Sequence, residues 1–319
     1  MIQLRELVKR YGPVLALDRL TLDIERGHVV GVLGPNGAGK TTTLRILTGF
    51  MPPTSGSAVV NGHDVLTDGR AARQSIGYLP ESTPLYPEMR VVEQLHYFGR
   101  LHGMKRADRK RRIEQLTEVC GLTAIIRRPI GHLSKGNRQR VGIAQALLHD
   151  PPVVILDEPT VGLDPGQIGE MRRLVTSLGE SKTVVISTHI LSEVERTCDR
   201  VVIIAGGRLV ADGSPADLKA QVRTASRVLI EVKAPAADVS RALAALPDVG
   251  KVETSEAAGW TTALVTAKQG GRDIRQLVGG AVAQRSWPLR ELRPETASLE
   301  AFYQQATTAA NHAEPARAA

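Results

Sequence analysis

An eight-residue run near the N-terminus narrows the choice of fold: Gly34-Pro35-Asn36-Gly37-Ala38-Gly39-Lys40-Thr41. It fits the pattern G-x-x-x-x-G-K-[ST]. The β-branched residues 29–33 predict a strand before it, and the residues from Thr42 onward predict a helix after it. A glycine-rich turn between a strand and a helix directs backbone N–H groups toward an anion, aided by the positive end of the helix. We therefore predict an α/β domain that binds phosphate groups at this turn.

The residues of this loop have distinct expected roles. Backbone N–H groups surround the phosphate oxygens, Lys40 neutralises the charge of the β- and γ-phosphates, and the Thr41 hydroxyl ligates Mg²⁺. The alternative is a glycine-rich turn with an incidental lysine, which the strand and helix on either side disfavour. The predicted nucleotide-binding residues of the loop are Gly34, Pro35, Asn36, Gly37, Ala38, Gly39, Lys40, Thr41 and Thr42.

An acidic pair, Asp157-Glu158, follows the apolar run 153–156, which predicts a buried strand. Parallel strands present their carboxyl-terminal residues at the ligand-binding edge of the sheet. Asp157 is therefore expected to hold Mg²⁺, and Glu158 to polarise the water that attacks a phosphate. Such a pair alone is an ordinary strand end, but together with the phosphate-binding loop it indicates nucleotide hydrolysis.

Residues 1–220 alternate short β-branched runs with longer helical patterns, which is typical of an α/β domain with a largely parallel sheet. The clearest strands are 29–33, 153–156, 183–187 and 201–204. Between about 85 and 148 the pattern becomes helical and charged. A helical subdomain is therefore expected to interrupt the α/β core.

A second, smaller domain is predicted over 227–305, after a boundary segment at 220–226. Its periodicities give the order β-α-β-β-α-β, which is that of a ferredoxin-like α+β fold. A terminal helix is expected to open at Ser298 and to end this domain. The remaining residues, 306–319, are mostly Ala, Thr, Asn, Glu and Pro, and we predict a disordered tail.

Composition limits the binding partners and the cellular location of the protein. The 319 residues include 41 Lys and Arg against 33 Asp and Glu, and the formal charge of +8 suits nucleic acid, an anionic membrane or an acidic ligand. The basic segment 105–112 lacks interleaved aromatic residues, so a solvated helix face is favoured over a nucleic-acid patch. The apolar runs are far shorter than the ~20 residues of a spanning helix. The two cysteines predict buried, reduced thiols and a cytoplasmic protein.

Over about 1–220 the chain resembles the ATP-binding cassette (ABC) family, because further motifs follow in family order. Leu133-Ser134-Lys135-Gly136-Asn137-Arg138-Gln139-Arg140 is similar to the family's signature motif. Ser134 is expected to cap a helix, and Gly136 to let the backbone close on an anion. The resemblance implies that Ser134, Lys135, Gly136 and Asn137 contact the γ-phosphate of an ATP held by a second copy of the chain.

Three single residues also match family positions. Asp164, in Gly162-Leu163-Asp164, resembles the D-loop at the dimer interface, His189 the switch histidine that contacts the γ-phosphate, and Tyr11 the aromatic that stacks on adenine. The resemblance implies a P-loop NTPase with a RecA-like core, a β-subdomain and an inserted helical subdomain. It also implies ATP and Mg²⁺ as cofactors, with Lys40, Glu158 and His189 as catalytic residues.

The sequence departs from the usual family pattern at two motifs. Glu81, in Tyr78-Leu79-Pro80-Glu81, stands where most cassettes have a glutamine. Its carboxylate keeps an oxygen for Mg²⁺ or water but loses the amide donor. The signature has Lys135 and Asn137 in place of the commonest Gly and Gln. With the ending 297–302, these variants are similar to a subgroup of bacterial exporter ATPases that includes the gliding-motility type.

The resemblance implies the ATP-hydrolysing subunit of a bacterial ABC exporter, a homodimer that drives a separate transmembrane permease and binds no nucleic acid directly. It is expected to be cytoplasmic and peripheral on the inner face of the cell membrane, with the permease received near Glu81 and 84–92. Two alternatives stay open. One is a soluble cassette ATPase that acts on DNA or ribosomes, and the other is a transporter ATPase whose domain 227–305 senses a ligand. The transported substrate cannot be inferred.

Overall fold

The computed structural model describes residues 1–221, 225–270, 273–294 and 299–312. The chain divides into two compact units, one made of Met1–Pro215 and the residues from Tyr303 onward, the other of Ala216–Phe302. The first boundary therefore precedes the one predicted at 220. The end of the chain groups with the first unit, whereas the sequence had placed residues up to 305 in the second.

A six-stranded sheet forms the centre of the first unit, with strand order β10-β9-β3-β8-β7-β6. All neighbours are parallel except β10 and β9, so the largely parallel sheet predicted from the sequence is confirmed. Its inner strands are buried along their length, which explains their continuous apolar runs. The strands are β3 (Val29–Leu33), β6 (Ile76–Leu79), β7 (Val153–Asp157), β8 (Thr183–Thr188), β9 (Arg200–Ala205) and β10 (Arg208–Gly213).

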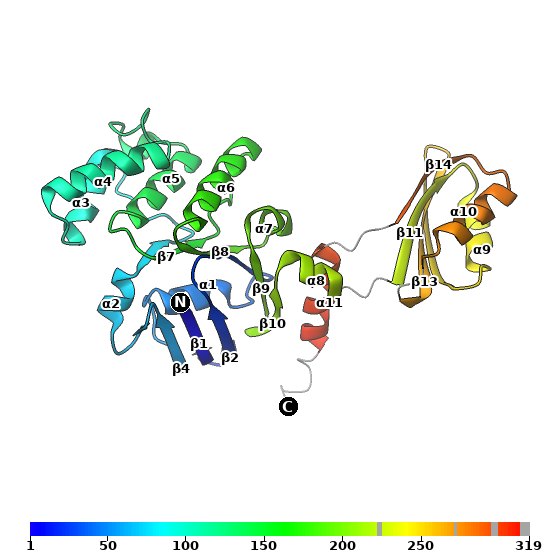
Figure 1. Cartoon of the computed structure of the whole chain (residues 1–319), viewed down its shortest axis with the longest axis horizontal. Helices are drawn as coiled ribbons and strands as arrows, with labels where there is room; N and C mark the ends of the chain where they lie inside the picture. Colours follow the sequence, from blue (N-terminus) through cyan, green and yellow to red (C-terminus); the bar gives the residue numbers. More distant parts are fainter. Residues whose placement is uncertain (222–224, 271–272, 295–298, 313–319) are drawn as a thin grey trace. The chain divides into compact units, whose positions relative to one another are not determined.

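A second sheet of the first unit is antiparallel, in the order β2-β1-β4-β5. One core cluster joins the two sheets, because it contains Leu4 and Leu20 of the antiparallel sheet together with Val30 and Ile155 of the central sheet. Figure 1 shows β1, β2 and β4 beside α1, the helix that follows the glycine-rich loop. The strands are β1 (Ile2–Tyr11), β2 (Val14–Ile24), β4 (Ser55–Val60) and β5 (His63–Asp64).

A group of helices stands between β6 and β7, where the sequence predicted a helical subdomain (Figure 1). It contains α3 (Val91–Leu101), α4 (Arg106–Val119), a 3-10 turn (Ile130–His132) and α5 (Lys135–Ala146). The other helices before residue 222 are α1 (Lys40–Leu47), α2 (Gly69–Gln74), α6 (Pro165–Gly179), α7 (Leu191–Thr197) and α8 (Pro215–Gln221). In the described part of the chain, no helix is both long and apolar enough to cross a membrane.

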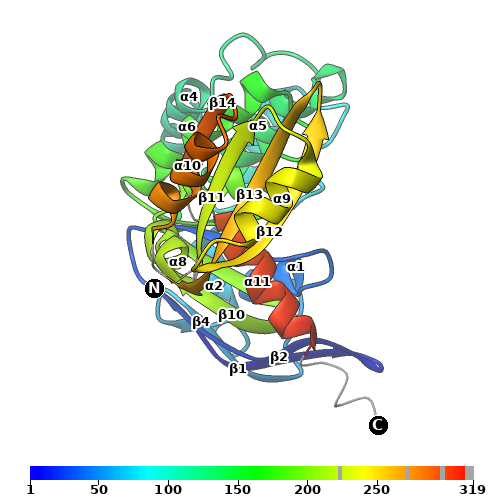
Figure 2. The same cartoon turned by 90° about the vertical axis from the view of Figure 1, so that its right-hand side faces the viewer.

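The second unit contains the predicted ferredoxin-like fold. Its four strands are antiparallel in the order β12-β13-β11-β14, and α9 and α10 lie on one face of this sheet (Figure 2). That face has its own core, which includes Val228, Ile230, Val265 and Val278. The elements are β11 (Ala225–Val232), α9 (Ala236–Ala244), β12 (Val249–Ala257), β13 (Trp260–Gly270), α10 (Arg275–Gln284) and β14 (Leu289–Pro294).

The end of the chain differs from its prediction. Helix α11 (Leu299–His312) runs through residues 306–312, so the expected disordered tail is wrong for these positions. The segment contains Ala306, Ala309 and Ala310, and alanine has the highest intrinsic helix propensity. Ser298, the predicted cap of this helix, and residues 313–319 lie outside the described residues.

Candidate functional site

The glycine-rich loop joins β3 to α1 in a conformation that requires glycine. The φ angles of Gly37 and Gly39 are +80° and +105°, in the region that side chains rarely adopt. A Cβ on Gly39 would lie 2.7 Å from Leu17 Cδ2, and one on Gly34 would lie 2.2 Å from the Ile204 carbonyl oxygen. The loop is thus packed against β2 and β9, while its tip at Asn36 is exposed.

Lys40, the first residue of α1, is almost fully buried. Its Nζ donates to the Gly34 carbonyl oxygen at 2.7 Å and lies 3.9 Å from Glu158 Oε1. Burial lowers the pKa of Lys40, and the nearby charges of Glu158, Asp157 and Glu81 oppose this shift. Because Lys40 opens α1, its ammonium group lies near the positive end of that helix, where it can bind a phosphate.

Asp157 ends β7 as a buried carboxylate. Its Oδ1 accepts hydrogen bonds from Ser187 Oγ at 2.5 Å and from Thr41 Oγ1 at 3.4 Å. Burial raises the pKa of Asp157, although these two hydrogen bonds oppose the shift. Carboxylate and hydroxyl oxygens this close suit Mg²⁺, which takes few protein ligands alongside substrate phosphates. The donor set of Asp157 and Thr41 thus fits the predicted ion.

Glu158 follows Asp157 in an unusual backbone conformation, with φ at +50°. Its N–H donates to Ser187 Oγ at 2.9 Å, and its Oε2 lies 3.0 Å from Nδ1 of His189. The Glu158 side chain is 10% exposed and that of His189 is 51% exposed. A carboxylate held between Lys40 and His189, at the edge of the sheet where the parallel strands end, is suited to accept a proton from water.

The structure brings five of the predicted residues together: Lys40, Thr41, Asp157, Glu158 and His189. Glu81 is exposed after β6. Its charge adds to the raised pKa of Asp157 and opposes the lowering of the Lys40 pKa, so it belongs to the same electrostatic environment. Thr42 is half-buried in the first turn of α1.

Other predicted residues lie apart from this group. Ser134 Oγ accepts from the Asn137 N–H and caps α5, while Asp164 caps α6. A Cβ on Gly162 would lie 2.6 Å from Lys135 Nζ, so the signature and the D-loop of one chain are adjacent. Within the described ranges, no hydrogen bond joins these residues to the glycine-rich loop.

Tyr11, the predicted adenine-stacking residue, is 44% exposed at the end of β1. Its hydroxyl lies 2.9 Å from the sulfur of Met51, and Lys9 Nζ lies 5.3 Å from the centre of its ring. The ring is therefore accessible and has a cation over it.

Sequence reasoning missed Ser187, which bonds both Asp157 and the backbone of Glu158. No sequence pattern marks this serine, because its role depends on the register that places it opposite Asp157 in the parallel β7–β8 pair. Sequence reasoning also missed Thr160, Thr188 and Glu193, which are joined by hydrogen bonds. Only the folded chain brings Glu193 of α7 to the segments that follow β7 and end β8.

Comparison with known proteins tests the resemblance. The family described as ABC transporter matches residues 17–161. The Nod factor export ATP-binding protein I of Cupriavidus pinatubonensis is 40% identical over 220 residues, which cover 68% of this chain and 67% of that protein. The uncharacterized ABC transporter ATP-binding protein YdbJ of Bacillus subtilis is 35% identical over 312 residues, or 97% of this chain and 96% of that protein. The chain belongs to the ABC transporter family.

A solved structure extends this result to three dimensions. The ATP-binding cassette MJ0796, in a dimeric post-hydrolysis state with ADP and Pi, is 26% identical and superimposes with a TM-score of 0.61. The match covers 67% of this chain and 98% of that chain. As a member of the ABC family, the chain carries an ATP-binding cassette, the domain with which ABC proteins bind and hydrolyse ATP.

Proposed function

We propose that this ABC chain is the ATP-hydrolysing subunit of an exporter, in which two copies close around ATP and drive a separate transmembrane permease. The observation that carries the proposal is the separation of the signature from the loop that binds phosphate. The capped N-terminus of α5 presents exposed Ser134 and Lys135 with no bond to that loop among the described residues. A complete site therefore requires a second copy. The dimer of MJ0796 and the Nod factor export relative support this proposal.

The residues have the following roles in the proposed mechanism. The loop 34–42 binds the phosphates, with Lys40 balancing their charge, while Thr41 and Asp157 hold the ion. Mg²⁺ bound there neutralises phosphate charge. Tyr11 packs on the base. The partner copy contributes Ser134, Lys135, Gly136 and Asn137, and Asp164 lies at the interface.

Proton transfer is assigned to Glu158. Its carboxylate accepts a proton from the attacking water, and His189 Nδ1, 3.0 Å from Oε2, orients the carboxylate beside the γ-phosphate. Glu81 sets the electrostatics of the ion site, because its charge acts on Asp157 and Lys40.

The permease surface is proposed around the helical subdomain. The chain has only three Phe, five Tyr and two Trp, yet several of these aromatic residues lie close together around α3. The rings of Tyr86, Tyr97 and Phe98 form a triangle with centres 5.5 to 6.4 Å apart, and Phe98 and Phe50 line one pocket. Phe50 is 73% exposed. The exposed rings of Phe50 and of Tyr86, which lies within 84–92, suit contact with a helix of the transmembrane partner.

Mixing two inactive variants tests the composite site. Lys40→Ala disables the phosphate-binding loop but keeps the signature, whereas Gly136→Asp does the reverse. In a mixed dimer one of the two sites combines an intact loop with an intact signature, so ATP turnover is expected to return. A matched control mixes Lys40→Ala with Glu158→Gln. Lys40 and Glu158 of one chain belong to the same site, so neither site of this mixed dimer is complete. Turnover that stays absent in the first mixture would contradict the composite site.

Co-purification tests the permease. The expected partner is a membrane protein of about six hydrophobic segments encoded beside this chain. Detergent extraction should recover the two chains together, and Phe50→Asp should reduce recovery while ATP binding persists. Recovery of the chain with DNA or ribosomes instead would favour the soluble alternative.

A further inference from the structure

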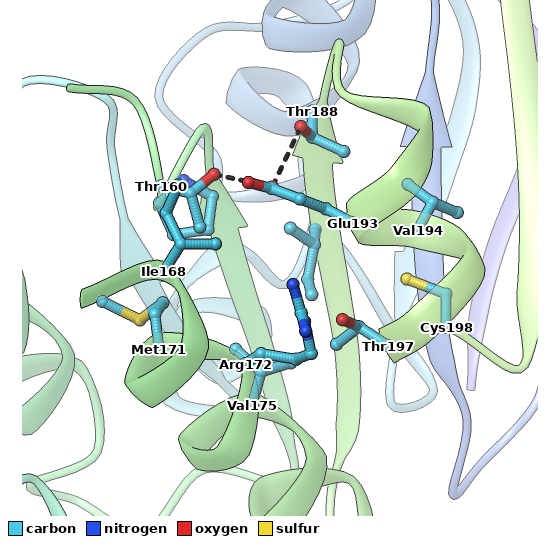
Figure 3. A pocket seen from close by; sticks show the side chains of 12 residues that line it. Thr160, Ile168, Met171, Arg172, Val175, Thr188, Glu193, Val194, Thr197 and Cys198 are labelled. Carbon is cyan, nitrogen blue, oxygen red and sulfur yellow. Dashed lines mark hydrogen bonds between the residues drawn. The ribbon is translucent and has the colours of Figure 1, made fainter. Parts of the chain in front are cut away.

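A carboxylate outside the phosphate-binding loop connects the segments that carry Glu158 and His189. Glu193 lies on α7, and its Oε2 accepts hydrogen bonds from Thr160 Oγ1 at 2.7 Å and from Thr188 Oγ1 at 3.5 Å. Figure 3 shows the carboxylate between the two threonines, at the pocket between α6 and α7. Thr160 stands two residues after Glu158, and Thr188 directly precedes His189.

These contacts close a ring. Two short stretches of chain, Glu158 to Thr160 and Thr188 to His189, form two sides of this ring. Glu193 joins them, because it accepts a hydrogen bond from each threonine. The contact between His189 Nδ1 and Glu158 Oε2 completes it. Both threonines are buried, so solvent does not replace their bonds to the carboxylate. The position of Glu193 therefore affects the spacing of Glu158 and His189.

The backbone of Glu158 needs this support. Its φ of +50° is unfavourable for a glutamate, and Pro159 restricts it further. Strained residues keep their conformation only where their surroundings fix it. Ser187 accepts a hydrogen bond from the Glu158 N–H. The hydrogen bond from Thr160 to Glu193 fixes the backbone that follows Glu158.

The second oxygen of Glu193 has an unusual environment. Oε1 is buried and has no hydrogen-bond partner in the part of the chain that the structure describes. Burying a polar atom without a partner lowers stability, so the carboxylate is not explained by folding alone.

We propose that Glu193 is a positioning residue for ATP hydrolysis. It holds Thr160 and Thr188 so that Glu158 and His189 keep their distance while the carboxylate accepts the proton of the attacking water. This inference rests on the proposed roles of Glu158 and His189.

Steady-state ATP hydrolysis by the full chain, measured as kcat and KM, tests the proposal. Glu193→Ala and Thr160→Val remove the same hydrogen bond from opposite ends, and each is expected to lower kcat about 10- to 100-fold, the scale of a misplaced catalytic group. KM for ATP should stay within about twofold, because the phosphate-binding residues are untouched. The double variant should be no slower than the slower single variant.

Conservative variants separate positioning from general destabilisation. Thr160→Ser keeps the hydroxyl, and Glu193→Gln keeps an acceptor oxygen, so both should retain most of the wild-type kcat. Glu180→Ala, at the exposed end of α6, is the matched control and should change nothing. If Glu193→Ala does not fold, the Thr160→Val and Thr160→Ser pair decides.

The proposal is overturned if Thr160→Val keeps its kcat within about twofold of wild type, or if Thr160→Ser is as slow as Thr160→Val. Glu158→Gln in the same assay distinguishes the two levels of inference. If Glu158→Gln hydrolyses ATP normally, the proposed function of Glu158 fails. If Glu158→Gln is inactive while the Thr160 and Glu193 variants are normal, only the positioning role fails.

Discussion

The Nδ1 atom of His189 lies 3.0 Å from Oε2 of Glu158, although the two residues follow different strands. The contact exists because β7 and β8 are parallel neighbours that end at the same edge of the sheet. The contact therefore fixes the direction of the Glu158 carboxylate as well as its position. Substitution of this side chain can separate ATP hydrolysis from ATP binding.

Replacing Glu158 by Gln should abolish turnover but not nucleotide binding. The amide keeps the shape and hydrogen-bonding capacity of the side chain but removes the basic oxygen, and general-base contributions are about 10²- to 10⁴-fold in rate. Binding should persist because Lys40, Thr41 and Asp157 are unchanged, so the variant should accumulate as a dimer. Size-exclusion chromatography should show that dimer with ATP and Mg²⁺ but not with ADP. If more than about a tenth of turnover survives, Glu81 is the next candidate base, and the double variant decides.

Gly39→Ala should greatly weaken nucleotide binding. The φ of +105° disfavours alanine, and its Cβ would lie 2.7 Å from Leu17 Cδ2, so the loop must move. Titration with a fluorescent ATP analogue measures the loss. Gly280→Ala is the control, because the structure shows open space around Gly280 in the middle of α10. That control should bind normally and unfold at a higher temperature, since alanine favours a helix by about 1 kcal/mol over glycine. Unchanged binding by Gly39→Ala would contradict the assigned loop.

Asp157→Asn should raise the stability of the nucleotide-free protein at neutral pH. Burial raises the pKa of Asp157 above 3.8, so the folded protein binds this proton more tightly than the unfolded chain does. Wild-type stability is therefore lost as pH rises through the folded pKa, whereas asparagine does not titrate. The melting-temperature difference should be positive at pH 7 and should narrow as pH falls toward 3.8. A variant that melts lower than wild type at pH 7 would contradict this account. The same variant should lose Mg²⁺-dependent ATP binding.

Removing 227–319 should leave a folded cassette that binds ATP, since the loop and both sheets of the first unit precede residue 216. The residues from Tyr303 onward nevertheless group with that unit, and burial raises the pKa of Tyr303. A second deletion, of 227–294 with a flexible linker to α11, should therefore melt at a higher temperature than the first. Equal melting temperatures would show that α11 contributes nothing, and failure of both to bind ATP would contradict the two-unit division.

The strand, turn and helix around the glycine-rich loop and the strand that ends at Asp157 could be predicted, because each is a contiguous run whose residues specify the local structure. The roles assigned to the loop and to the Asp157-Glu158 pair stay predictions. The ferredoxin-like order followed from periodicity for the same local reason. The antiparallel sheet of β1, β2, β4 and β5 was expected only through the family resemblance.

Interactions between distant segments could not be predicted in this way. Ser187, Thr160 and Glu193 are ordinary polar residues in sequence, and only the pairing of β7 with β8 and the position of α7 bring them together. The tail was misjudged because polar composition outweighed the helix propensity of its alanines.

The left-handed backbone of Glu158 has a consequence for evolution in the laboratory. A non-glycine residue at φ +50° stores about 1–3 kcal/mol of strain. Selection for thermal stability alone would therefore favour glycine or asparagine at this position. The selected variants would be more stable proteins that bind ATP without hydrolysing it. Screens for a stable enzyme must therefore select for turnover at each round, because the backbone conformation of Glu158, the proposed base, lowers the stability of the protein.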